Sequence, residues 1–189
     1  LDRLEEVTNI PQMDTSTDKL ETSHYDITLD HVSFGYDKRQ VIHDISLNIP
    51  EHTTCAIVGP SGSGKTTLCN LIARFWDVQD GAVRIGGKDV KNYTADSILE
   101  HISMVFQNVY LFHDSIENNI KFGKPDATHE EVEAAAKRAC CHDFISALAD
   151  GYNTIIGEGG STLSGGEKQR ISIARAILKD APIIILDEA

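Results

Sequence analysis

Apolar residues recur along the chain at two different spacings, and each spacing predicts a different kind of element. Near the N-terminus they alternate with polar residues, first at Ile27 and Leu29 and then at Ile45, Leu47 and Ile49. Alternation places the apolar side chains on one face of a strand. The turn-like stretch "GYDKRQ" lies between the two runs. This part of the pattern predicts a lobe of antiparallel strands.

Three continuous apolar runs predict further strands, buried in a core. They are "TTCAIVG" at residues 53–59, "ISMVF" at 102–106 and "IIIL" at 183–186. The stretch "GAVRIGGKDV" has Gly86 and Gly87 at its centre, which is typical of a tight hairpin.

Helical spacing appears between the apolar runs. "TTLCNLIARFW" follows the first run directly. In the span from Asp126 to Asp150, Thr128 and Glu131 have capping-box spacing. The apolar face of that span comprises Val132, Ala135, Ala136, Ala139 and Cys140. A glycine-rich loop then leads into a helix that carries Ile171, Ala174 and Ile177. Strands separated by helices predict an α/β fold with a parallel core, to which antiparallel and helical lobes are attached.

Composition narrows the classes of partner and compartment. A formal net charge of −12 over 189 residues disfavours a nucleic-acid backbone as the main partner. The four cysteines show no disulfide or C-x-x-C spacing, so we expect a reducing compartment. No apolar run approaches the ~20 residues of a membrane helix, and we see no signal peptide.

The stretch "GPSGSGKT" fits the phosphate-loop pattern G-x-x-x-x-G-K-[ST]. Gly62 and Gly64 allow the backbone to fold tightly with its N–H groups turned inward. The following helix points its positive dipole end at an anion, Lys65 supplies a cation, and the Thr66 hydroxyl can ligate Mg²⁺. A chance turn is the alternative, which the predicted strand before and helix after disfavour. The predicted nucleotide-binding residues are Gly59, Pro60, Ser61, Gly62, Ser63, Gly64, Lys65, Thr66 and Thr67.

Two adjacent carboxylates, Asp187 and Glu188, follow the last apolar run. The carboxyl ends of parallel strands meet at one edge of a sheet, where α/β folds bind ligands. Asp187 is therefore a candidate second Mg²⁺ ligand, and Glu188 is the candidate base for water attack on the terminal phosphate. Taken alone, the pair is more typical of a solvated turn. The phosphate loop reverses that preference.

A second glycine-rich helix start occurs in "LSGGEKQR". Ser164 and Glu167 have capping-box spacing. Gly165 and Gly166 would cost ~1 kcal/mol each inside a helix relative to alanine, but in the first turn they allow close approach to the backbone amides. An ordinary helix start remains the alternative interpretation.

The order of these motifs, a phosphate loop, a Gln after a strand, "LSGGE" and then "ILDE", resembles the nucleotide-binding domain of ATP-binding cassette (ABC) transporters. The resemblance covers about residues 25–189. It implies a P-loop NTPase core, ATP and Mg²⁺ as cofactors, and head-to-tail dimers in which Ser164, Gly165, Gly166 and Glu167 complete the site of a partner domain. It also implies that Tyr36 stacks on adenine and that Gln107 touches Mg²⁺ and the attacking water.

Other stretches resemble exporters of this family. They are "GEGG" with Glu158, "LFHDSIENNIKFG", and the leading "LDRLEEV", which is similar to a linker after a last transmembrane helix. Leu111, Phe112 and Ile116 are candidates for a patch that docks on a membrane domain, and core packing is an equal candidate. We expect residues 1–24 to be a linker, residues 25–189 to be the ATPase domain and residues 108–165 to hold a helical subdomain.

The sequence thus predicts the ATPase domain of an ABC exporter on the cytoplasmic face of a membrane, with a transmembrane domain upstream on the same polypeptide. A soluble ABC ATPase of DNA repair or translation is one alternative, and a cassette that binds ATP without hydrolysis is another. Compared with the family pattern, we expect the part that follows "LDEA" to be missing. We therefore expect these 189 residues alone to bind MgATP weakly at best and to show almost no sustained hydrolysis.

Overall fold

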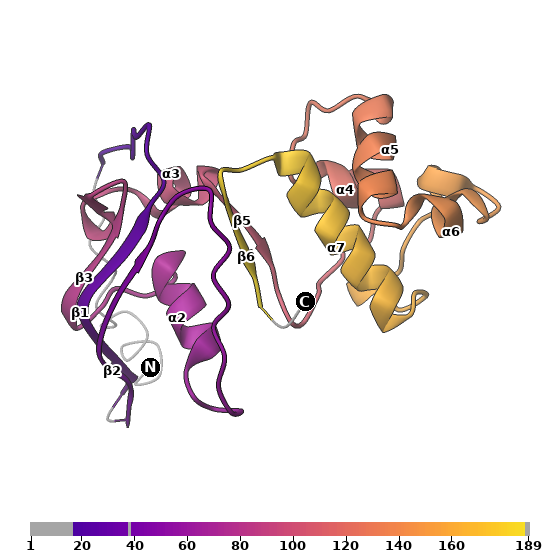
Figure 1. Cartoon of the computed structure of the whole chain (residues 1–189). Coiled ribbons are helices and arrows are strands. Elements are labelled where there is room, and N and C mark those ends of the chain that lie inside the picture. Colours follow the sequence, from indigo (N-terminus) through magenta and orange to yellow (C-terminus); the bar gives the residue numbers. More distant parts are fainter. Residues whose placement is uncertain (1–16, 38, 188–189) are drawn as a thin grey trace, which may run out of the picture. The chain divides into compact units, whose positions relative to one another are not determined.

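The computed structural model describes residues 17–37 and 39–187, which divide into two compact units, one ending at Leu99 and one beginning at Glu100 (Figure 1). The predicted linker at residues 1–24 falls largely outside the described residues. The predicted domain bounds stay predictions.

The first unit contains the antiparallel lobe predicted from alternation. Strands β1 (Ile27–Tyr36), β2 (Arg39–Ile49), β3 (Asp80–Ile85) and β4 (Lys88–Asp89) pair in the order β2-β1-β3-β4. The predicted hairpin joins β3 to β4, with Ile85 opposite Lys88. Gly86 and Gly87 have φ values of 57° and 73°. Two successive positive φ angles match the twist of a two-residue hairpin turn, which is why two glycines stand there.

Helix α2 (Lys65–Ile72) gives this unit its second layer of packing and begins at the predicted phosphate loop. It buries Leu68, Cys69, Leu71 and Ile72. Two short elements follow the sheet, η1 (Val90–Asn92) and α3 (Ala95–Glu100).

The strand predicted at residues 53–59 is wrong for the described structure. These residues have no strand conformation and are mostly exposed, with Val58 at 88%. A strand requires hydrogen bonds to a neighbour. No described strand pairs with this segment, so an apolar run alone did not make a strand here.

The second unit contains the two other predicted strands. β5 (Ile102–Val105) and β6 (Ile183–Leu186) lie side by side and parallel, with Ile102 opposite Ile183 and Val105 opposite Leu186 (Figure 1). The prediction that β6 is fully buried is wrong. Ile183 and Ile185 are buried, whereas Ile184 and Leu186 are 58% and 59% exposed. In the described structure β6 pairs only with β5 and alternates between a covered and an open face.

The second unit also contains several helices. They are α4 (Ile116–Lys121), α5 (His129–Arg138), α6 (His142–Ser146) and α7 (Gly165–Lys179), with the short helices η2 (Gly151–Asn153) and η3 (Glu158–Gly160). Their core includes Ile120, Val132, Ile145, Ile156 and Ile171, each fully buried. The predicted helical span 126–150 is thus divided between α5 and α6.

One residue of the predicted apolar face is misplaced. α5 ends at Arg138, and Cys140 adopts a left-handed φ of 56°. This turn exposes Cys140 and buries Cys141 instead. Periodicity alone could not show where the helix ends.

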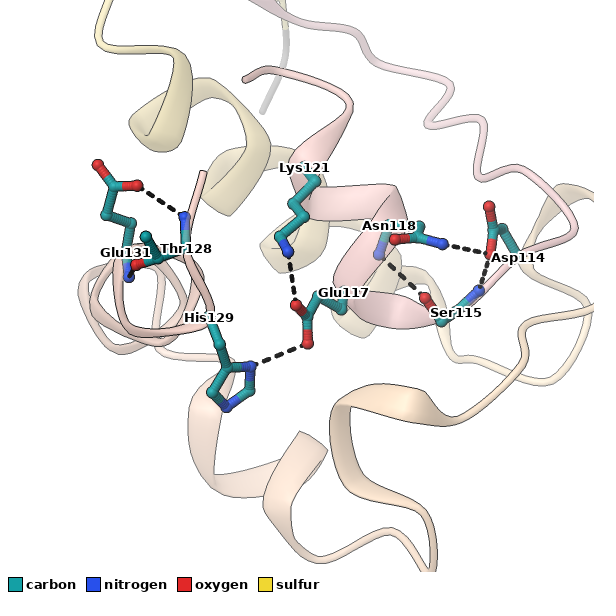
Figure 2. Close-up of polar contacts among 8 residues, drawn as sticks. All are labelled: Asp114, Ser115, Glu117, Asn118, Lys121, Thr128, His129 and Glu131. Carbon is teal, nitrogen blue, oxygen red and sulfur yellow. Dashed lines mark hydrogen bonds and ion pairs between the residues drawn. The ribbon is translucent and has the colours of Figure 1, made fainter. Parts of the chain in front are cut away.

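Side-chain hydrogen bonds fix the starts of α4 and α5 (Figure 2). Ser115 caps α4 by accepting from the Asn118 N–H at 3.0 Å. The predicted capping box of Thr128 and Glu131 is confirmed at the start of α5. Glu117 joins the two helices, since its carboxylate contacts Lys121 Nζ at 2.8 Å and His129 Nδ1 at 2.9 Å.

The candidate docking residues divide between core and surface. Leu111 and Ile116 are fully buried in the core of the helical unit, so core packing is the correct interpretation for both. Phe112 is 41% exposed and packs against the exposed rings of Tyr110 and Phe122. A docking role for Phe112 stays a prediction.

Candidate functional site

The predicted phosphate loop is a tight turn that leads directly into α2. Gly62 and Gly64 have φ values of 78° and 92°, a region that side chains disfavour. The Ser63 N–H donates to the Pro60 carbonyl at 3.2 Å and closes the turn. A Cβ on Gly64 would lie 2.8 Å from Ile42 Cδ1. The conformation therefore favours glycine at residue 64, and a side chain there would also require Ile42 to move.

Helix α2 follows Gly64, and no described side chain caps its N-terminus. The first residues of the helix, Lys65, Thr66 and Thr67, carry no carboxylate. The Leu68 N–H makes the first helical bond, to the Gly64 carbonyl at 2.8 Å. The amides before it lie at the positive end of the helix dipole. This end of α2 is suited to an anion.

Lys65 lies over the loop that precedes it. Its Nζ donates to the carbonyls of Gly59 and Pro60, each at 3.1 Å. The hydrogen bonds are exposed to solvent, so an arriving phosphate can exchange for these carbonyls as the partner of the ammonium group. The arrangement places a cation and a set of backbone amides at one loop.

Tyr36 is brought to the same helix from the end of β1. Its hydroxyl lies 3.5 Å from Thr67 Oγ1, and the residue is 37% exposed. The rings of Phe34 and Trp76 pack against Tyr36 at 5.1 and 5.4 Å between centroids. The first unit therefore unites the candidate adenine-binding and phosphate-binding residues. The contacts of Trp76 were not predicted, although the chain's one tryptophan, in the loop after a phosphate-loop helix, was a signal that could have prompted them.

Gln107 and Asp187 come together in the second unit through strand register. Because Val105 pairs with Leu186 in a parallel ladder, both residues emerge at the carboxyl edge of the β5–β6 sheet. The Asp187 N–H donates to the Val105 carbonyl at 3.0 Å, and Asp187 is only 5% exposed. Gln107 is exposed. Glu188, the candidate base, lies outside the described residues.

The helix start at Ser164 has the predicted capping box. Ser164 Oγ accepts from the Glu167 N–H at 3.4 Å, and Glu167 Oε2 accepts from the Ser164 N–H at 2.8 Å. The Ser164 hydroxyl also donates to that carboxylate, at 2.7 Å. The hydroxyl, followed by the amide, lowers the pKa of Glu167 below its ordinary value. Gly165 and Gly166 remain as the first two helical residues, whose amides have no partner within the helix. The side chain of Glu158 lies outside the described part.

The predicted Mg²⁺ ligands offer chemistry that suits this ion. A threonine hydroxyl, a carboxylate and an amide are hard oxygen donors, and Mg²⁺ is usually held by one or two carboxylates together with waters and substrate phosphates. Across residues 17–37 and 39–187 no group of three or more His, Cys, Asp or Glu could hold a metal ion. No helix in that part of the chain is long and apolar enough to cross a membrane.

A phosphate loop that opens a helix beside an exposed aromatic ring defines a P-loop nucleotide-binding protein. Comparison with known proteins extends this class to a family, because residues 42–189 match the family described as "ABC transporter". The chain therefore belongs to the ABC transporter family.

Similar proteins include an ATP-dependent lipid A-core flippase of Desulfotalea psychrophila, 52% identical over 84% of this chain and 28% of that protein. The β-(1→2)glucan export ATP-binding/permease protein NdvA of Brucella suis is 52% identical over 87% of this chain and 28% of its own length. A mycobactin import ATP-binding/permease protein, IrtA of Mycobacterium tuberculosis, is 49% identical over 86% of this chain and 19% of its own.

A solved structure of a bacterial Atm1-family ABC exporter with ATP bound matches with a TM-score of 0.92 and 39% identity. The match covers 99% of this chain and 33% of that one. The predicted P-loop NTPase fold is thereby confirmed. The chain spans 28% of the length of the two 52%-identical relatives.

Proposed function

We propose that this chain forms the MgATP-binding part of the ATPase domain of an ABC exporter, and that the protein that carries this domain hydrolyses ATP there. The observation that carries the proposal is the start of α2, where a glycine turn, the positive end of a helix and Lys65 lie beside the exposed ring of Tyr36. Adenine stacks on Tyr36, and the phosphates are held at the loop of residues 59–66. The ATP-bound exporter to which the chain is similar supports this assignment.

The remaining candidates take roles around the terminal phosphate. Lys65 holds the outer phosphates. Thr66 and Asp187 would hold a Mg²⁺ ion, which would supply charge neutralisation at the transferring phosphoryl group. Gln107 orients the attacking water and touches the same ion, and Glu188 accepts the proton of that water. The shared sheet edge of Gln107 and Asp187 supports their joint role.

The start of α7 serves a second copy of the domain. Ser164, Gly165, Gly166 and Glu167 form an N-terminus whose first amides are left for an outside ligand. In a head-to-tail dimer, this end closes over the phosphates held by the partner's loop. Each site is then complete only in the dimer, which couples ATP binding to association.

The whole protein is proposed to couple this cycle to transport across a membrane. Relatives of this chain bear names that combine export with an ATP-binding and a permease part. The domain, at residues 25–189 with a helical subdomain at 108–165, then works at the cytoplasmic face beside a transmembrane domain of the same polypeptide.

The test of hydrolysis is the substitution Glu188→Gln in the protein that carries this domain. The amide keeps the size of the side chain but cannot accept a proton. The variant should bind MgATP normally, release almost no phosphate and accumulate as an ATP-bound dimer. Phosphate release and light scattering measure the two effects. Turnover close to that of the unchanged protein would show that Glu188 is not the base.

A further inference from the structure

The loop that follows α2, residues 74–79, packs against the strand end that carries Tyr36. We propose that this buttress loop, through Trp76 and Gln79, holds Tyr36 in its base-stacking position and so sets the preference for an adenine nucleotide over a bare triphosphate. The inference rests on the proposed function of Tyr36. It assigns a positioning role to two residues that contact Tyr36 or its strand rather than the phosphates.

Ring geometry gives the first argument. Trp76 meets Tyr36 with centroids 5.4 Å apart and planes at 85°, and Phe34 meets it at 5.1 Å and 88°. Two perpendicular neighbours fix the plane of the Tyr36 ring, since a rotation of that ring would break both edge contacts. Neither neighbour lies parallel to Tyr36, which keeps 37% of its surface exposed. The contacts orient the ring without covering it as a stacked ring would.

Backbone contacts give the second argument. Gln79 Oε1 accepts from the Gly35 N–H at 3.0 Å, and Gln79 Nε2 donates to the Gly35 carbonyl at 3.0 Å. One side-chain amide thus satisfies both backbone groups of the residue between Phe34 and Tyr36. The Gln79 N–H also donates to the Ser33 carbonyl at 3.2 Å. The end of β1 is therefore tied to the buttress loop at main-chain level.

The buttress loop is itself anchored. Arg74 is only 2% exposed, and its Nε donates to Asp77 Oδ1 at 2.9 Å. Its guanidinium also donates to the Tyr93 carbonyl. The Phe75 N–H donates to the Asn70 carbonyl at 2.9 Å, which joins the loop to the last turn of α2. A buried, paired arginine gives the loop a defined conformation from which Trp76 and Gln79 can act.

Helix α2 therefore connects the phosphate-binding part of the nucleotide site to the part that binds the base. The same helix begins at the phosphate loop and ends at the loop that holds Tyr36. Ordering the ring in advance avoids an entropic cost when the base binds. Stacking of a base on an aromatic ring commonly contributes about tenfold or more in affinity. The contribution of base stacking to the affinity depends on the buttress loop, whereas the contribution of the phosphate contacts does not.

The experiment compares the affinities of the chain for MgATP and magnesium tripolyphosphate by calorimetry. We expect the unchanged chain to prefer MgATP by about tenfold. Trp76→Leu and Gln79→Met should each reduce that preference several-fold and leave tripolyphosphate affinity unchanged, whereas Trp76→Phe should retain most of it. Phe122→Leu removes an exposed ring from the other unit and is the control that should change neither affinity.

Fluorescence gives a reading that needs no substitution, because Trp76 is the only tryptophan in the sequence. A base stacked on Tyr36 should alter the emission of the neighbouring indole, so MgATP should shift it and tripolyphosphate should not. Equal effects of both ligands would overturn the inference. So would a nucleotide preference that survives in both Trp76→Leu and Gln79→Met. If the unchanged chain bound neither MgATP nor tripolyphosphate, the result would instead contradict the proposed function.

Discussion

Each unit of the molecule contains a glycine-rich loop that leads into a helix. The two helices differ in whether a side chain caps the N-terminus. At α2 the residue before the helix is Gly64, and no described side chain caps it. At α7 that residue is Ser164, which forms a reciprocal capping box with Glu167. Each loop also has a lysine folded onto it, since Lys65 donates to the Gly59 carbonyl and Lys168 to the Gly159 carbonyl.

From this difference we expect that glycines at a helix start do not by themselves make a phosphate site. At α7 the chain satisfies amides with its own side chains, and the carboxylate of Glu167 places negative charge where an anion would arrive. At α2 the first turn carries no carboxylate, and Lys65 adds positive charge. We therefore expect α2 to hold a free triphosphate by itself, and α7 to meet phosphate only when another domain presents it.

The strongest test of this difference is Lys65→Ala. Removal of a charge-assisted contact to phosphate should weaken MgATP binding by roughly 10- to 100-fold. The lysine is exposed at its hydrogen bonds, so thermal stability should be unchanged. Calorimetry measures the affinity. Lys168→Ala is the matched control at the other loop and should leave it unaltered. Equal losses in both variants would contradict the distinction.

A second test addresses α7 in the protein that carries this domain. Ser164→Arg puts a bulky side chain in front of the Gly165 and Gly166 amides and removes the cap. Each domain should still bind ATP, because the loop at α2 is untouched, while ATP-induced dimerisation falls by about tenfold or more, as expected when a close contact at an interface centre is blocked. Light scattering with ATP measures this. Ser146→Arg adds the same cation at another exposed serine and should dimerise normally.

Substitution of alanine for glycine should change the free energy of unfolding in opposite directions at the two helix starts. Gly64→Ala forces a side chain into φ 92° and toward Ile42, which should cost about 1–2 kcal/mol of the free energy of unfolding. Gly165→Ala meets no atom within 4 Å in the described structure and should stabilise the chain by about 0.5 kcal/mol through helix propensity. Urea unfolding measures both. Destabilisation by Gly165→Ala would show that its backbone is constrained as at Gly64.

These local features are the ones that the sequence predicts best. The capping boxes at Thr128 and Ser164 and the hairpin at Gly86 depend on residues within a few positions of each other. The phosphate loop is equally local, since the turn and the helix start lie in one continuous stretch. Motif order also predicted that Gln107 and Asp187 follow strands, and the register of β5 and β6 brought the two to one edge.

The features that the sequence missed depend on distant partners. Whether residues 53–59 form a strand depends on a neighbour to accept their hydrogen bonds, which an apolar run does not reveal. The exposure of Ile184 and Leu186 depends on what covers β6. The hydrogen bonds between the Gln79 side chain and the Gly35 backbone join residues far apart in sequence. Tertiary context decides such contacts, and local patterns are silent about them.

The smallest expected effect is a pH dependence that the start of α7 should show and the start of α2 should not. The Ser164 hydroxyl and amide hold the pKa of Glu167 below its ordinary value in the folded chain. A carboxyl group with a lowered folded pKa contributes stability above its unfolded pKa, and that stability is lost as the pH falls through the folded pKa. Glu167→Gln should therefore cost a few tenths of a kcal/mol near neutral pH, an amount reduced by the solvent exposure of the group.

The test measures the free energy of unfolding by urea from pH 7 to 3, for the unchanged chain and for the Glu167→Gln variant. The difference between the unchanged chain and Glu167→Gln should shrink as the pH falls below the ordinary range of a glutamate, about 4 to 5, because protonation removes the negative charge that strengthens the cap. The first turn of α2 holds Lys65, Thr66 and Thr67 and offers no carboxyl group to titrate. Two curves that stay parallel over the whole range would mean that the charge of Glu167 adds nothing to the start of α7, and that its hydrogen-bond geometry alone separates the two helix ends.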